Sequence, residues 1–213
     1  MANTYNPFGF RQFGRREGAS PTAGFDRLFL ASSDANLYFT GDVVCLSSAT
    51  TGTNPNTISL WSGSSGYIPV GVFMGCKYYS PSVGRTVWSS YFPGNVGSSS
   101  PCDAYVCTDV EQRYIAQAST TSGVVGSSMI GWGITIASSG QASGNTTTGI
   151  SNIALASSVT SIQSATSPFK VVDVYSNWAP SGVNGTSTGS EGGAILVVVP
   201  NNWFYQGLNS AST

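Results

Sequence analysis

Nine acidic side chains and no histidine are the groups from which this chain would have to build catalytic chemistry. Without histidine, nucleophiles activated in Ser-His or Cys-His pairs are excluded. Two carboxylates can still cleave a glycosidic bond when one is protonated and the other ionised. Asp109 and Glu111 are spaced to face the same side of a strand edge, but Arg113 follows them closely. This pattern is more typical of a solvated charged rim than of an acid/base pair, so we expect no catalytic residues and no enzyme activity.

The four cysteines, Cys45, Cys76, Cys102 and Cys107, are the remaining residues that could hold a metal. A zinc site without histidine would need all four thiolates, and the sequence has no Cys-x-x-Cys pair to support one. It also has no Asp-x-Asp-x-Asp-Gly loop for calcium. In a reducing cytosol the thiols are expected to be free and mostly buried. We therefore expect neither a metal nor another cofactor.

Residues 1–27 combine aromatic and cationic side chains in a pattern that could bind a protein surface. They contain half of the chain's 8 cationic residues, interrupted by glycines and prolines that oppose a helix. Two interpretations are open: a loop packed on the chain's own core, or an extended arm that fills pockets on a neighbouring subunit. We favour the arm and predict as its contact residues Tyr5, Phe8, Phe10, Arg11, Phe13, Arg15, Arg16 and Phe25.

The five tryptophans are dispersed along the chain, at Trp61, Trp88, Trp132, Trp178 and Trp203. Three of them fall in segments with strand character, so packing in the core or in a subunit interface is the favoured use. Because aromatic rings also stack on sugars, a carbohydrate-binding face is the alternative.

Low charge is the unusual feature of the composition. Only 8% of residues are charged, against about 25% in an ordinary soluble domain. With 40% hydrophobic and 12% aromatic residues, the chain can still bury a real core. Hydroxyls and amides can be desolvated against a partner at lower cost than ions, which suits large protein contacts. The net charge is −1 and no basic stripe follows Arg27, so nucleic-acid binding is not expected.

No apolar run has the length of a membrane span, since the longest, at residues 194–199, has the size of a strand. The first residues lack an apolar stretch after their basic residues, which argues against a signal peptide. We therefore expect a protein that is made and kept in a cytosol, or leaves it only by lysis, without a membrane partner.

Short apolar segments separated by turn signals predict an all-β fold, a small barrel or sandwich over residues 28–213. Gly71 and Gly75 lie within the longest segment and suggest bulges or close backbone approach. The predicted strands are residues 27–31, 37–40, 43–46, 57–61, 67–79, 85–92, 103–108, 113–117, 169–176 and 194–199.

Residues 118–167 are rich in serine, threonine and glycine and contain few large apolar anchors. Residues 131–136 could form a strand, followed by a turn or loop at 138–149. Two interpretations are open for the whole region. It is either an insertion that projects from the barrel, or it supplies two further strands of the main sheet.

Several short motifs resemble those of lambda-like head-decoration (cement) proteins of tailed bacteriophages. They are Tyr5-Asn-Pro-Phe-Gly-Phe-Arg, Ser20-Pro-Thr-Ala-Gly-Phe, Gly41-Asp-Val-Val, Ile68-Pro-Val-Gly-Val-Phe-Met-Gly-Cys-Lys-Tyr and Val87-Trp-Ser-Ser-Tyr-Phe-Pro-Gly. The resemblance covers roughly residues 1–117.

This resemblance implies a structural virion protein that binds the outer surface of the mature capsid. Such a protein bridges neighbouring major capsid subunits and stabilises the head without chemistry. Homotrimers at three-fold positions are implied, with dimers at two-fold positions as the alternative, because this chain is longer than the short members. Two rival functions share the expected fold: a fibre head that binds a receptor or glycan, and a tail or baseplate subunit.

Overall fold

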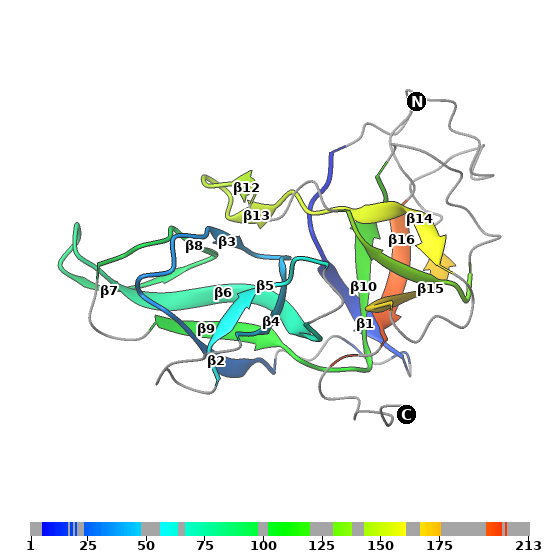
Figure 1. The fold of residues 1–213 in the computed structure, drawn as a ribbon, viewed down its shortest axis with the longest axis horizontal. Helices are drawn as coiled ribbons and strands as arrows, with labels where there is room; N and C mark the ends of the chain where they lie inside the picture. The colour runs from blue at the N-terminus through cyan, green and yellow to red at the C-terminus, as the bar shows by residue number, and fades with distance from the viewer. Residues whose placement is uncertain are drawn as a thin grey trace.

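The computed structural model describes residues 6–16, 18, 20, 24–47, 56–63, 67–97, 102–119, 130–137, 143–160, 167–175, 195–201 and 203. Throughout this part of the chain the secondary structure is β, which confirms the predicted fold class. Two six-stranded antiparallel sheets dominate, with strands that run in nearly perpendicular directions in Figure 1, and side chains of both sheets share one buried cluster in a sandwich-like packing. Within the described residues they do not close into a barrel.

Sheet 1 draws its strands from the whole length of the chain. Its order is β1 (Arg11–Arg15), β10 (Gln112–Gln117), β16 (Ile195–Pro200), β15 (Phe169–Val174), β11 (Gly133–Ile136) and β14 (Leu155–Thr160).

Sheet 2 is built from one continuous part of the sequence. Its order is β2 (Asp26–Leu30), β9 (Cys102–Cys107), β6 (Pro69–Ser80), β4 (Val43–Leu46) and β5 (Ile58–Leu60), and β7 (Arg85–Ser89) also pairs with β6. Two short two-stranded ladders accompany the sheets, β3 (Tyr38–Phe39) with β8 (Tyr91–Phe92), and β12 (Gly144–Asn145) with β13 (Ile150–Ser151).

Sheet 2 has a core on each of its two faces. Successive side chains of a strand point to opposite faces, so Val43 of β4 joins the cluster between the sheets and Val44 joins the cluster on the far face. The cluster between the sheets also contains the buried side chains of Trp61 and Trp203. The indole N–H of Trp61 donates to Tyr67 O, and that of Trp203 donates to Pro168 O. The core role expected for tryptophan holds for these two.

Residues 118–167 contribute two strands to sheet 1, β11 and β14. Between these strands, the β12–β13 hairpin lies against the β3–β8 ladder, where a Cβ at Gly144 would meet the Phe39 ring. The interpretation as two further strands of the main sheet therefore describes this region, and a projecting insertion does not. The physical reason is that Ile134, Ile136 and Leu155, although few, all lie in the core between the sheets. Residues 120–129, 138–142 and 161–166 lie outside the described part.

The described part of residues 1–27 does not form a separate arm. Phe10 is fully buried and its ring stacks on Phe169 at 4.5 Å between centroids. The Phe10 N–H donates to Gly41 O at 3.0 Å, and β1 pairs with β10 immediately afterwards. The interpretation as a segment packed on its own core is right here, because an aromatic ring and four strand positions find partners within the chain.

The two glycines of β6 mark places where its neighbours approach closely, as predicted. A Cβ at Gly71 would lie 2.4 Å from Val106 Cγ1 and 2.5 Å from Cys107 O. Gly75 has a φ of +146°, and the pairing of β6 with β9 shifts register between Phe73 and Gly75. Glycine at position 71 thus lets β6 and β9 pack at hydrogen-bonding distance.

Substitution of Gly71 by alanine is expected to lower the free energy of unfolding by about 1–3 kcal/mol, because the added methyl group must displace β9. Urea denaturation followed by tryptophan fluorescence measures the change. Gly24→Ala is the matched control, since a Cβ there meets nothing within 4 Å. Equal stability of the two variants would contradict the steric role of Gly71.

Candidate functional site

The edge of sheet 1 exposes an aromatic and cationic surface that belongs to β1. Phe13 occupies a bulge in the pairing with β10, remains 44% exposed, and meets the Tyr175 ring edge-on at 5.3 Å. Phe8 is half-buried beneath Arg11, whose guanidinium lies 5.1 Å from the ring centroid. We call Phe8, Arg11, Phe13, Arg16 and Tyr175 the N-terminal surface.

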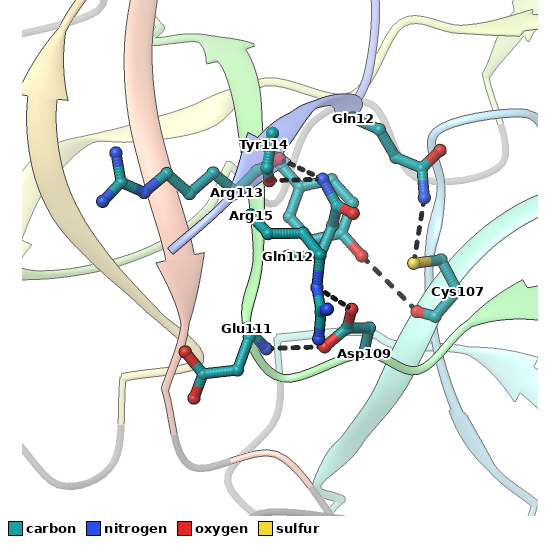
Figure 2. A network of polar contacts seen from close by, with 9 residues as sticks. Gln12, Arg15, Cys107, Asp109, Glu111, Gln112, Arg113 and Tyr114 are labelled. Atoms are coloured by element: carbon teal, nitrogen blue, oxygen red, sulfur yellow. Dashed lines mark hydrogen bonds and ion pairs between the residues drawn. The ribbon is translucent and has the colours of Figure 1, made fainter. Parts of the chain in front are cut away.

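Ion pairs hold this segment to the turn between β9 and β10, and Figure 2 shows the one between Arg15 and Asp109. Arg15 Nε lies 3.0 Å from Asp109 Oδ2, and Arg16 Nη1 lies 3.9 Å from Glu111 Oε1. The Gln112 side chain adds a hydrogen bond from Nε2 to Gly14 O at 2.7 Å. These contacts fix the position of the N-terminal surface relative to sheet 1.

Asp109 and Glu111 lie in this turn and not along a strand edge as expected. The Glu111 N–H donates to Asp109 Oδ1 at 2.9 Å, as in an Asx turn, which explains why the chain reverses here. Each carboxylate faces an arginine of the N-terminal segment. The arrangement is a charged rim in which two carboxylates pair with two arginines and hold the N-terminal segment to this turn.

A second exposed surface lies on sheet 2, where sheet 1 no longer covers it. At one end, Val72 of β6 and Cys107 of β9 face the core between the sheets. Two and four residues before Cys107, Tyr105 and Asp103 point to the same side of the strand, and both are partly exposed. The inner face of sheet 2 is thus a core at one end and a surface at the other.

Two aromatic rings dominate this surface. Trp88 of β7 stacks on Tyr105 of β9, with centroids 4.9 Å apart and planes at 18°, and Trp88 is 68% exposed. The strand between them, β6, presents Gly75 opposite Tyr105, so no side chain separates the rings. The rings line an open groove of about 660 Å³, which we call the aromatic groove, formed by Phe25, Met74, Gly75, Cys76, Trp88, Ser89, Ser90 and Tyr105.

Charged groups lie beside the aromatic groove. Lys77 Nζ lies 5.6 Å from the centroid of the Trp88 ring, within the range of a cation–π contact. Arg27 Nη2 forms an ion pair with Asp103 Oδ1 at 2.8 Å. The groove therefore has apolar walls and charged hydrogen-bonding groups next to them.

A buried polar junction lies behind the groove. Asp42 is 1% exposed; its Oδ1 accepts from Ser151 Oγ at 2.5 Å and its Oδ2 accepts from the Phe39 N–H at 2.7 Å. Burial raises the pKa of Asp42 to about 7, although both hydrogen bonds act to lower it. Thr40 connects this junction to the groove, because its Oγ1 donates to Ser90 O at 2.7 Å.

All four cysteines are buried free thiols, as the sequence indicated. Burial raises the pKa of Cys76 to about 12 and that of Cys102 to about 11. Since the thiolate is the reactive form, neither of these two thiols is an activated nucleophile at neutral pH. Within the described residues, no three His, Cys, Asp or Glu side chains gather into a possible metal site.

The structure separates the predicted contact residues into three places. Phe8, Arg11, Phe13, Arg15 and Arg16 lie along the edge of sheet 1.

The other three predicted contact residues lie elsewhere. Phe10 belongs to the core, and Phe25 lines the aromatic groove on sheet 2. Tyr5 lies outside the described residues. Burial of Phe10 rules out the contact role predicted for it, whereas Phe25 is exposed and its contact role stays a prediction.

The sequence pattern does not indicate the aromatic groove as a site, because it favours a core or interface position for Trp88. The available signal was alternation: Lys77, Trp88 and Tyr105 each lie next to a buried or half-buried neighbour in a strand. Trp88 is not a core residue. Trp132 is half-buried, and Trp178 lies outside the described part.

Comparison of the chain with protein-family models, curated proteins and solved structures found no match. Among the residues that the structure describes, no helix is long and apolar enough to cross a membrane.

Proposed function

We propose that the protein is a non-enzymatic structural subunit that binds the outer surface of a mature phage capsid and bridges neighbouring major capsid subunits. The observation that carries this proposal is the N-terminal surface, where the exposed Phe13 side chain lies on an edge strand between exposed Arg11 and Arg16. Aromatic residues and arginine are the side chains most enriched at the energetic centres of protein interfaces. The capsid is proposed as the partner because the sequence motifs resemble those of head-decoration proteins.

The surface fits attachment through side chains better than attachment through an added strand. The bulge at Phe13 bends β1, and such bulges and edge charges disfavour continued strand pairing. Burial of the exposed part of one phenylalanine contributes up to about 2 kcal/mol, so a single copy binds weakly. A homotrimer, or alternatively a dimer, would multiply this affinity by about 10²–10⁴ when its copies dock together.

Combined replacement of Phe13 and Arg16 by serine is expected to weaken binding to expanded, undecorated phage heads at least about tenfold. The reason is that the variant loses the apolar anchor Phe13 and the cation Arg16. The fold should be little affected by the second change, because the ion pair of Arg16 with Glu111, at 3.9 Å, is exposed and contributes little to folding. Cosedimentation with titrated protein measures affinity and stoichiometry. Val83→Ser is the matched control, since Val83 is 56% exposed in the turn between β6 and β7.

Wild-type occupancy by the double variant would exclude the N-terminal surface as the attachment site. Failure of the unaltered protein to bind heads would remove the capsid proposal itself. Location on the purified particle would then distinguish the two rivals, a tail or baseplate subunit and a fibre head.

A further inference from the structure

We propose that the aromatic groove is a carbohydrate-binding site in which a pyranose ring stacks on the exposed face of Trp88. This activity is separate from capsid attachment. In Figure 1, β7, which carries Trp88, lies at the left end of the molecule, and β1 lies in the right-hand sheet. A copy attached through its N-terminal surface therefore carries the groove on a different part of the molecule.

The first argument is the geometry of the aromatic pair. The Trp88 ring lies nearly parallel to Tyr105, at 4.9 Å and 18°, and Lys77 Nζ is within 5.6 Å of its centroid. These contacts hold the indole as a flat platform, although 68% of the residue is exposed. The apolar C–H face of a sugar ring matches such a surface, whereas an aromatic anchor of a protein interface fills a pocket in its partner.

The second argument is size. The open groove has a volume of about 660 Å³, within the range of about 300–1,000 Å³ typical of small-ligand sites. A stable protein interface needs about 800 Å² on each partner, which is a larger and flatter surface than a groove lined by eight residues.

The third argument is the polar chemistry around the platform. Ser89 and Ser90 line the groove, and a serine hydroxyl can both donate and accept a hydrogen bond. Lys77 and the Arg27–Asp103 ion pair add charged donors and a carboxylate acceptor beside Trp88 and Tyr105. Such a mixture of donors and acceptors matches sugar hydroxyls. It does not match the charged backbone of a nucleic acid, because the face has only two cations among the described residues and one of them is paired with Asp103.

The test measures binding of soluble oligosaccharides to the full-length protein without heads. The probes are lactose, cellotetraose and chitotetraose, each followed by isothermal titration and by saturation-transfer NMR. At least one probe is expected to bind, and Trp88→Ala is expected to weaken that binding at least about tenfold. Tyr79→Ala is the matched control, since Tyr79 is an aromatic residue of β6, 43% exposed, and does not line the groove.

The proposal is overturned if none of the three probes binds, or if Trp88→Ala binds the best probe as well as the unaltered protein. It is also overturned if Trp88→Ala leaves sugar binding intact but loses attachment to heads, because the groove would then be a protein-docking surface. Unchanged thermal unfolding of the variant ensures that the comparison concerns the site and not the fold. Failure of head binding by the unaltered protein bears on the capsid proposal alone.

Discussion

Replacement of Phe10 by alanine is expected to lower the free energy of unfolding by about 3–5 kcal/mol, the range seen when a fully buried aromatic side chain is removed. Phe10 is 0% exposed and its ring contacts both Phe169 and Tyr114 in the core between the sheets. Deletion of residues 2–24 is expected to lower the free energy of unfolding by more than this, because it would also remove β1. Urea denaturation at neutral pH measures the effect.

Phe13→Ala is the control for this experiment, because Phe13 lies three residues further along the same segment but is 44% exposed. It should cost less than about 1 kcal/mol. A truncated chain that lacks residues 2–24 and unfolds at the wild-type urea concentration would show that the segment is a dispensable arm after all.

The second large effect concerns pH and Asp42. An unfolded aspartate ionises near 3.8, whereas Asp42 in the folded protein ionises at about 7. Between these values the folded state binds more protons than the unfolded state, so stability falls as pH rises. A difference of this size corresponds to a loss of about 4 kcal/mol between pH 4 and pH 8. The raised pKa values of Cys76 and Cys102, at about 12 and about 11, lie above this window.

Asp42→Asn is expected to abolish this pH dependence. Asparagine keeps one oxygen to accept from the Phe39 N–H, and its amide can donate to Ser151 Oγ where the carboxylate now accepts. The variant should therefore match the wild type at pH 4 and exceed its stability at pH 8. Chemical denaturation at pH 4, 5.5, 7 and 8 measures both curves. Parallel curves would assign the pH dependence to other groups.

Much of the fold could be predicted because its strands are local patterns. Residues 43–46 were predicted as a strand with the bounds that β4 has, and the long segment 67–79 corresponds to β6 within two residues at each end. The course of residues 9–16 could not be predicted in this way. Phe10 and Phe13 look alike in the sequence, and what separates them is pairing with β10, about a hundred residues away.

The aromatic groove could not be predicted from the sequence, for a related reason. Alternation shows that Trp88 and Tyr105 share a face with apolar residues, but it cannot show which part of that face is covered. That depends on sheet 1, which covers Val72 and Cys107 and leaves the other end of sheet 2 open. A short stretch of sequence contains no information about how far one sheet extends over another.

The two sheets take their strands from different lengths of the chain, and this affects the order in which they can fold. Sheet 2 uses strands that lie within residues 26–107, so it can assemble on the ribosome before the rest is synthesised. Sheet 1 combines β1 with strands as late as β16, and its contacts span nearly the whole chain. Such long loop closures are slow, because the entropy of each loop is lost before its contacts form. Because its core partner Phe169 is synthesised late, Phe10 remains exposed for most of synthesis. Premature termination would release sheet 2 without sheet 1, in a form prone to aggregation.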